Sequence, residues 1–308
     1  MDDHAAQALD LLADFPRVSA AEWEALILQD LKGAPYDKRL IWRTEDDIGV
    51  RPYYRREHLD QLGIDPDLAP GQFPYRRGPG RTWQEQEEFS APENSIRADQ
   101  YHEAGATTVQ ELAFGLAEAV DRLAADIERG TTASNAAQGT VFVFAVGSNY
   151  FLEIAKLRAA RLLWSTAVSA FEISDEGPAL CQIYARTSRL NKSLLDPYTN
   201  LIRVTTEAMS AVIGGCDTLH VEPFGFDAQL ALSVHRLLRE EAQLGRVLDV
   251  AGGSYYVEVL TDLLANQAWA LFQTIEQGGG WTEAIKSGFA AEQLKVSRDA
   301  KSHDVAVR

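Results

Sequence analysis

The sequence predicts an α/β fold in which parallel strands and crossover helices form an incomplete (β/α)8 TIM-like barrel, preceded by an extended N-terminal arm. After about residue 93, strand patterns and helix patterns alternate along the chain, which implies a parallel sheet. Residues 140–146 form a continuous apolar run with β-branched and aromatic side chains, as in a strand covered on both faces. About four strand–helix units lie between residues 94 and 244, whereas a complete barrel needs eight. The count indicates half a barrel, or an open sheet that needs a partner.

A capping box begins the first expected helix. The Ser19 side chain can accept a hydrogen bond from the backbone three residues on, while Glu22 reaches back to the Ser19 backbone. Apolar residues follow at helical spacing and Gly33 supplies a stop, so we expect a helix over residues 20–32. Residues 39–43 are a short strand candidate.

Residues 51–80 are rich in Pro, Gly, Tyr and Arg and follow no sustained period. Because proline lacks a backbone donor and resists regular structure, this stretch is either an extended arm that lies on another surface or a plain irregular linker. We therefore expect the chain to divide into an N-terminal helix and extended arm, residues 1–90, and a partial barrel domain, residues 91–308.

The elements after residue 93 are expected in a definite order. The first long helix begins at a capping box of Thr108 and Glu111 and ends at Gly130. Asp196 as N-cap and Pro197 at the first helical position begin a later one. The other expected helices are residues 149–164, 226–244, 261–277 and 281–298, and the helix from Pro197 runs to residue 213. The expected strands are residues 94–99, 140–146, 179–185 and 217–222, with a doubtful one at 246–250.

Composition excludes several classes of function. The formal net charge is −16, whereas binding of duplex nucleic acid through bulk electrostatics needs a basic surface. No apolar run reaches the ~18 residues of a membrane span, and the acidic start lacks an apolar signal core, so we expect a cytoplasmic location. The two cysteines, Cys181 and Cys216, fit a reducing compartment. No close His pair, Cys pair or H-E-x-x-H sequence occurs, so we expect no bound metal.

Arginine and tyrosine residues cluster in the arm of this acidic chain. They are Arg51, Arg55, Arg56, Arg76, Arg77 and Arg81, with Tyr53, Tyr54 and Tyr75 between them. Arginine binds phosphate through two parallel hydrogen bonds, so a nucleotide-like cofactor tail is one expected ligand. The alternative is that these arginines neutralise carboxylates on this chain or on a partner.

Three histidines are candidates by position. His102 follows the strand candidate at 94–99, at the carboxyl end where α/β sheets place ligands, although it can equally be a residue at the start of a helix with no ligand. His220 either points into a barrel mouth or is satisfied in the core. His235 lies in an expected helix beside an arginine and is expected on the surface.

Several segments resemble motifs of the cobalamin-dependent acyl-CoA mutases. The matching segments are FPYRRG at residues 73–78, YHEAGA at 101–106, NYFLEIAKLRAARLLW at 149–164, DPYTN at 196–200 and EAMSAVIGG at 207–215. Within that family, the chain looks like methylmalonyl-CoA mutase, in particular its small (beta) subunit, whose N-terminal extension resembles the opening of this chain. The resemblance implies a (β/α)8 barrel that threads coenzyme A along its axis and a radical rearrangement started by adenosylcobalamin.

The chain departs from that family pattern in ways that bear on catalysis. No D-x-H-x-x-G cobalamin loop is present, and the family's first four barrel strands are missing between residues 83–87 and the fifth-strand motif. Counting from Glu103, Gln100 takes the place of the catalytic histidine, and His102 matches only if two residues are deleted. Arg186 stands where the family places a glutamine at the substrate. We therefore expect no catalytic residue and no cofactor bound by this chain.

The first expected function is a non-catalytic partner of a large (alpha) mutase subunit, which would carry adenosylcobalamin and isomerise methylmalonyl-CoA and succinyl-CoA. Self-association is the other expected way to cover open sheet edges. Two alternatives stay open: a CoA-ester-binding protein that acts alone, and an inactive truncated scaffold. The candidate substrate-binding residues, with an acyl-CoA as ligand, are Tyr75, Arg76, Arg77, His102 and Arg186.

Overall fold

A computed structural model describes residue 15 and residues 18–65, 68–171 and 180–307. The chain forms two compact units, of which the first comprises residues 1–44 with 49–52, and the second residues 45–48 with 53–308. The expected boundary at residue 90 between an arm and a barrel domain stays a prediction.

The first unit holds two helices and a short antiparallel ribbon. Its elements are α1 (Ala20–Asp30), α2 (Tyr36–Leu40), β1 (Trp42–Arg43) and β2 (Gly49–Val50). The expected capping box is confirmed, since the Glu22 amide donates to Ser19 Oγ at 3.2 Å and the Glu22 carboxylate accepts from the Ser19 amide at 2.8 Å. The strand expected at 39–43 is mostly wrong, because α2 runs to Leu40 and leaves a strand of two residues. Within its own unit, α1 buries no residue.

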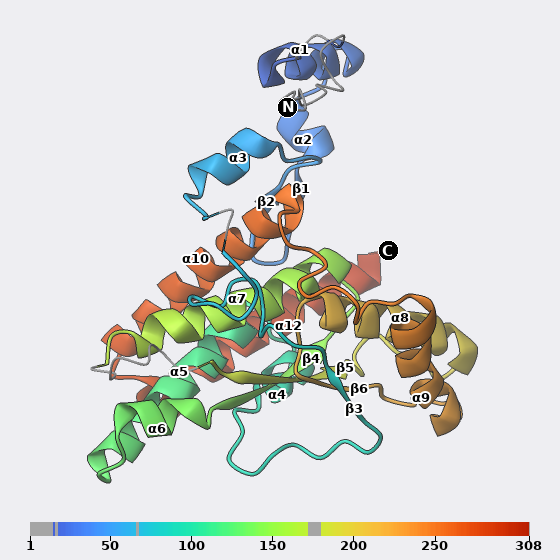
Figure 1. Cartoon of the computed structure of the whole chain (residues 1–308). Helices are drawn as coiled ribbons and strands as arrows, with labels where there is room; N and C mark the ends of the chain where they lie inside the picture. The colour runs from blue at the N-terminus through green and yellow to red at the C-terminus, as the bar shows by residue number, and fades with distance from the viewer. Residues whose placement is uncertain (1–14, 16–17, 66–67, 172–179, 308) are drawn as a thin grey trace, which may run out of the picture. The chain divides into compact units, whose positions relative to one another are not determined.

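The second unit is built on a parallel four-stranded sheet with the order β3-β6-β5-β4 (Figure 1). The strands are β3 (Gln84–Gln86), β4 (Val141–Val146), β5 (Gln182–Thr187) and β6 (Thr218–His220). Ile96 makes an isolated parallel bridge to Phe142 on β4, so it extends the same sheet by one position. Ala145, Arg186, His220 and Gln86 share one register row across the four strands. The parallel α/β sheet expected from the sequence is therefore confirmed.

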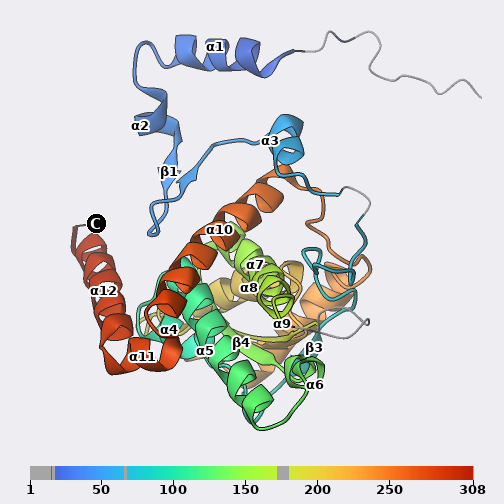
Figure 2. The same ribbon diagram turned by 90° about the vertical axis from the view of Figure 1, so that its left-hand side faces the viewer.

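Helices follow the strands and pack on one another. They are α3 (Arg56–Gln61), α4 (Ala98–Glu103), α5 (Thr108–Glu128), α6 (Ala133–Gln138), α7 (Tyr150–Val168), α8 (Pro197–Ile213), α9 (Ala228–Arg236) with the π-helical turn η1 (Leu237–Glu241), α10 (Tyr255–Gln277), α11 (Trp281–Lys286) and α12 (Phe289–Val307). Helix α7 packs against α5, α8 and α10, and Figures 1 and 2 show α5, α7 and α10 side by side. Among the described residues, none of these helices is both long and apolar enough to cross a membrane.

Helix α7 is unusual because its buried face carries cations. Arg158 and Arg161 are each 1% exposed. Arg158 pairs with Asp249 and, at 2.6 Å, with Glu258 on α10. Arg161 donates to Asp217, just before β6, at 2.7 Å. Removing one partner of such a pair leaves a buried charge uncompensated, which typically costs ~3–5 kcal/mol. These pairs therefore fix α7 against α10 and against the amino end of the sheet.

Four local expectations are corrected by the structure. The capping box of α5 is formed by Thr107 and Gln110 rather than Thr108 and Glu111, because the Glu111 carboxylate is buried in an ion pair instead. The strand expected at 94–99 shrinks to the bridge at Ile96, because α4 begins two residues later.

The doubtful strand at 246–250 is wrong. This segment is a turn in which Asp249 adopts φ 53° and its carboxylate accepts from Arg77 at 2.7 Å. The helix expected over 281–298 is interrupted at Gly288, whose φ of 80° a helix does not allow. Strand β3 was not expected at all.

His235 also corrects an expectation, since it is 1% exposed rather than a surface residue. Its Nδ1 has no hydrogen-bond partner among the described residues. Burial, followed by the nearby His220 and Arg239, lowers the pKa of His235 to about 4. The folded protein therefore holds this ring neutral at pH values where the unfolded chain binds a proton.

The first prediction concerns Asp217, which serves two arginines and the Ile183 amide, at 2.8 Å. We expect Asp217→Asn to lower the free energy of unfolding by about 3 kcal/mol, because Arg161 keeps its buried charge and loses its counter-ion. The control Asp126→Asn removes an exposed pair with Arg129 and should cost less than about 1 kcal/mol. Urea denaturation measures both, and equal midpoints for the two variants would contradict the role assigned to Asp217.

The second prediction concerns pH. Because the pKa of His235 is lowered on folding, the unfolded state binds its proton first, and stability falls as the pH drops from about 6.5 to about 4. The measured quantity is the decrease in unfolding free energy between pH 6.5 and pH 4. We expect this decrease to be about 3 kcal/mol smaller in His235→Gln than in the wild type. The same pH slope in both proteins would show that His235 is not the responsible group.

Candidate functional site

The carboxyl ends of the parallel strands form the first candidate site, because α/β sheets place ligands there. The structure brings two of the expected residues, His102 and Arg186, to this end. It places Tyr75, Arg76 and Arg77 elsewhere, on a loop that precedes β3.

His102 lies in a chain of hydrogen bonds and charges. Its Nε2 is 2.9 Å from Ser188 Oγ, just beyond β5, and its Nδ1 is 3.4 Å from the Glu111 carboxylate. Lys156 donates to the same Glu111 carboxylate at 2.7 Å and forms an ion pair with Glu153 at 2.6 Å. Burial opposes the charge on Glu111, but the Lys156 ammonium and His102 hold the pKa of that carboxyl below its ordinary value. Glu111 and Glu153 in turn raise the pKa of Lys156 against the effect of its burial.

A serine, a histidine and a carboxylate in this order resemble the arrangement of a nucleophile, its base and an orienting group. Ser188, however, is 1% exposed, and its Oγ already accepts from the Leu190 amide at 3.1 Å. A substrate carbonyl needs direct access to the nucleophile. The arrangement therefore holds the chain in place rather than offering a reactive oxygen.

Arg186 is fixed by two carboxylates. Its Nε donates to Asp99 at 2.8 Å, and its Nη1 lies 3.1 Å from Glu103. Asp99 is fully buried and also accepts two hydrogen bonds from Arg97, each at 2.8 Å. Burial works against the charged form of Asp99, but the two arginines hold the pKa of Asp99 below its usual range. The guanidinium of Arg186, which is 7% exposed, is thus committed to this chain's own charges.

Phe89 lies over the same cluster and was missed at the level of sequence. The guanidinium groups of Arg97 and Arg186 lie 5.3 Å and 5.5 Å from the centre of its ring, and the His220 ring lies 5.7 Å away. Phe89 belongs to the short segment between β3 and Ile96. In the sequence, Phe89 is a single aromatic residue among mostly acidic and small ones. Such an isolated residue does not indicate that its side chain packs on the arginines at the carboxyl end of the sheet.

The more exposed side chains at the carboxyl end of the sheet also have partners on this chain. Arg189 lies 2.7 Å from Glu222, and His220 Nδ1 donates to the Gln86 carbonyl at 3.1 Å. The neighbouring His220 and Arg189 lower the pKa of Glu222 to about 2. We call the residues at this end the carboxyl-end cluster. It comprises Phe89, Arg97, Asp99, His102, Glu103, Arg186, Ser188, Arg189, His220 and Glu222.

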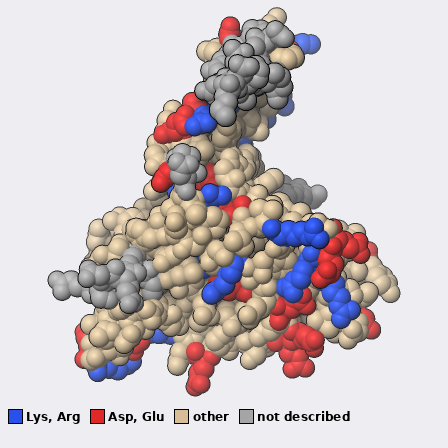
Figure 3. Space-filling model, viewed as in Figure 1, with Lys and Arg blue, Asp and Glu red and all other residues tan. Residues whose placement is uncertain are grey.

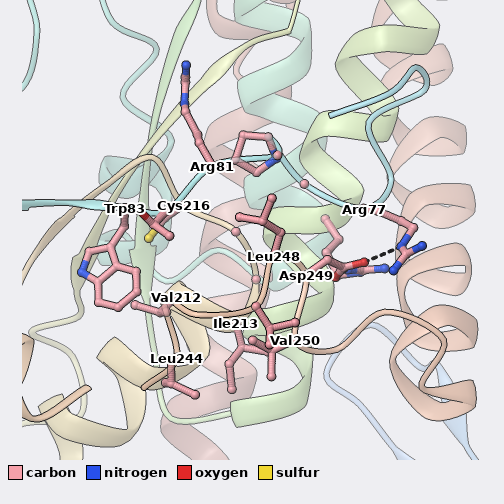
Figure 4. Close-up of a pocket in the computed structure, with 18 residues that line it drawn as sticks. Arg77, Arg81, Trp83, Val212, Ile213, Cys216, Leu244, Leu248, Asp249 and Val250 are labelled. Carbon is pink, nitrogen blue, oxygen red and sulfur yellow. Dashed lines mark hydrogen bonds and ion pairs between the residues drawn. The ribbon is translucent and has the colours of Figure 1, made fainter. Parts of the chain in front are cut away.

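A small pocket lies at the opposite, amino-terminal end of the sheet. Figure 4 shows its apolar lining, with Trp83 before β3 and Cys216 before β6. Arg77 and Arg81 are its cationic residues from the arm. Apolar side chains also line it: Val212, Ile213, Leu244, Leu248 and Val250.

The arginines of the arm are already paired with carboxylates. Arg77 donates to Asp249 at 2.7 Å and to a backbone carbonyl at 2.6 Å, as the dashed line in Figure 4 marks for Asp249. Arg76 is 3.2 Å from Glu258 and 3.3 Å from Asp262. Of the two roles expected from the sequence, the contacts of Arg76 and Arg77 therefore match the neutralisation of carboxylates on this chain.

Tyr75 precedes them with φ 62° and packs edge-on against Phe73. Burial raises the pKa of its hydroxyl. Over the part of the chain that the structure describes, no group of three or more His, Cys, Asp or Glu side chains can hold a metal ion. On the face seen in Figure 3, described acidic and basic side chains alternate on the side where α8 and α9 lie, without a continuous basic area.

Comparison with known proteins gives one family. The family model for methylmalonyl-CoA mutase matches residues 82–308. A methylmalonyl-CoA mutase of Cereibacter sphaeroides is 41% identical over 224 residues, which is 70% of this chain and 31% of the relative. A probable methylmalonyl-CoA mutase small subunit of Mycobacterium bovis is 38% identical, over 68% of this chain and 35% of the relative. The chain thus spans about a third of the length of these relatives.

A further relative covers more of the chain. The methylmalonyl-CoA mutase small subunit of Porphyromonas gingivalis is 27% identical over 429 residues, which covers 97% of this chain and 69% of the relative. The alignment is longer than this chain of 308 residues, so a long stretch of the relative has no counterpart here. The resemblance drawn from the sequence motifs is confirmed, and the chain belongs to the methylmalonyl-CoA mutase family.

Proposed function

We propose that the chain is a non-catalytic subunit that pairs with the large (alpha) subunit of a cobalamin-dependent acyl-CoA mutase. The large subunit would isomerise methylmalonyl-CoA and succinyl-CoA. One observation carries the proposal: Arg186, at the place where the family resemblance puts a substrate glutamine, is held by Asp99 and Glu103.

Energetics support a closed carboxyl-end cluster. An acyl group could enter only if Phe89 moved away and the Arg186–Asp99 pair separated. Asp99 is fully buried, and breaking a buried ion pair typically costs ~3–5 kcal/mol. Binding of a small thioester would have to supply that free energy before it gained any contact of its own.

The sheet supports the need for a partner. We propose that Ile96 and the four strands are neighbouring positions of a (β/α)8 barrel whose other strands are missing. The segment of the Porphyromonas gingivalis relative without a counterpart here supports this interpretation. Two sheet edges result, one at β3 and one at Ile96, and unpaired edges favour association with another chain.

Adenosylcobalamin belongs on the partner in this proposal. The histidines near the carboxyl end do not fit a corrinoid: His102 bonds Ser188, His220 bonds the Gln86 carbonyl, and His235 is buried. When bound to the partner, the cofactor would supply the radical chemistry. The residues of this chain would position the partner and exclude water. We place the complex in the cytoplasm.

The structure disfavours a CoA-ester-binding protein that acts alone through its arginines. A CoA diphosphate needs cations that are free to bind it. Arg76 and Arg77 are engaged with carboxylates, and the more exposed Arg81 is paired with Asp217 at 2.6 Å. An inactive truncated scaffold is the remaining alternative, and it predicts no ligand binding and weakly cooperative thermal unfolding.

The third prediction tests the subunit role. We expect this chain to co-purify with a large methylmalonyl-CoA mutase subunit of the same organism after co-expression, as a complex of defined stoichiometry by size-exclusion chromatography with light scattering. The open sheet edges and the apolar surface described below are the physical reason. If the two proteins elute separately, and this chain alone is a stable monomer, the subunit role is wrong.

The fourth prediction concerns the ligand. In calorimetric titration of the isolated chain with methylmalonyl-CoA, we expect no saturable heat, because the cations of the arm and the carboxyl-end cluster are already paired. Saturable binding that is lost in Arg77→Ala but kept in Arg129→Ala, a change at an exposed arginine, would support the CoA-binding alternative instead.

A further inference from the structure

The segment that follows β5, together with the start of α8, exposes five large apolar side chains within thirteen residues. The residues and their exposed fractions are Leu190 52%, Leu194 84%, Leu195 97%, Tyr198 72% and Ile202 69%. We call these five residues the Leu190–Ile202 face. Single exposed leucines are ordinary, but a concentrated apolar surface marks an interaction site.

The loop that carries this face is fixed rather than free to fold inward. Asn200, which is fully buried, accepts from the Ser193 amide at 2.9 Å and donates to the Ser193 carbonyl at 2.7 Å. One residue earlier, Lys192 is buried against Glu207 at 2.6 Å. Leu194 and Leu195 therefore project from a loop that is anchored directly before them. A surface already in its bound conformation loses little entropy on binding.

Helix α8 is apolar on two sides. Its inner side buries Val204, Ala208 and Ala211 against the sheet and α7. Its outer side presents Tyr198 and Ile202, which are four residues apart and so lie one turn above the other. The inner side accounts for the packing of this helix in the fold. The outer side has no such role in the described part of the chain.

The size of the face fits a protein partner. From the exposed fractions, the five side chains present roughly 600 Å² of surface, if a large apolar side chain presents about 150–200 Å². A stable interface buries about 800 Å² on each partner, with an apolar centre and a polar rim. The face is therefore large enough for the centre of such an interface.

We propose that the Leu190–Ile202 face is the docking surface for the large mutase subunit, an inference that rests on the proposed function. A second copy of this chain fits less well, because each copy carries a formal charge of −16 and the copies repel each other. The face also continues into the carboxyl-end cluster, since the Leu190 amide donates to the same Ser188 hydroxyl that bonds His102. A partner seated here would cover the closed end of the sheet.

The test uses the whole chain with the double change Leu194→Ser and Leu195→Ser. Both side chains are exposed, so the melting temperature should stay that of the wild type. Two central contact residues lost together should raise the dissociation constant for the purified large subunit at least about 100-fold. The matched control is Ile285→Ser, on α11, which is 57% exposed and should change the constant less than about threefold. Surface plasmon resonance measures all three proteins.

Each other outcome identifies a different error. If the wild type and the double variant bind the large subunit equally, the proposed face is wrong and the subunit role survives. If the wild type does not bind the large subunit at all, both proposals fall. If the wild type forms instead a homodimer that the double variant splits into monomers, the occupant is a second copy, and the large-subunit proposal is overturned.

Discussion

The buried cations of α7 are the constraint on which the rest of the second unit depends. Lys156 faces Glu111 on α5, Arg158 faces Glu258 on α10, and Arg161 faces the carboxylate before β6. A buried charge tolerates no loss of its counter-ion, so each pair specifies which element lies against α7 and at what height. The family motif that contains these three cations is therefore a packing motif, and the helix it forms joins the two ends of the sheet.

The same constraint explains why the candidate site is closed. Lys156 holds the Glu111 carboxylate that faces His102, so the histidine is fixed by a charge that the fold itself requires. At the neighbouring strand end, Arg186 and Asp99 complete a second buried pair under Phe89. Groups that would bind a thioester are thus used for internal neutralisation. The exposed apolar side chains that we propose for recognition lie on the loop after β5 and on the outer side of α8.

Sequence patterns predicted the strong elements and missed those made by tertiary contacts. The apolar run of β4 and the Asp196–Pro197 start of α8 are local signals, and the structure confirms both. Strand β3 lies at the edge of the sheet and has the sequence Gln-Glu-Gln. Its side chains are largely exposed, so the sequence shows no apolar strand pattern there. The burial of Arg186 could not be predicted either, since it depends on a carboxylate 87 residues away in the sequence. The motif resemblance identified the family. The exposure of Leu194 and Leu195 could not be predicted, because it depends on the conformation of the loop that Asn200 anchors.

Hydrogen–deuterium exchange of the intact chain tests the central claim most directly, with methylmalonyl-CoA and with the large subunit added separately. The account predicts that the large subunit slows exchange in residues 190–202, while methylmalonyl-CoA alone changes no peptide. Slower exchange on addition of methylmalonyl-CoA alone, in the peptides that hold Asp99, His102 and Arg186, would contradict it, because the thioester would then enter an end of the sheet that the fold is claimed to close.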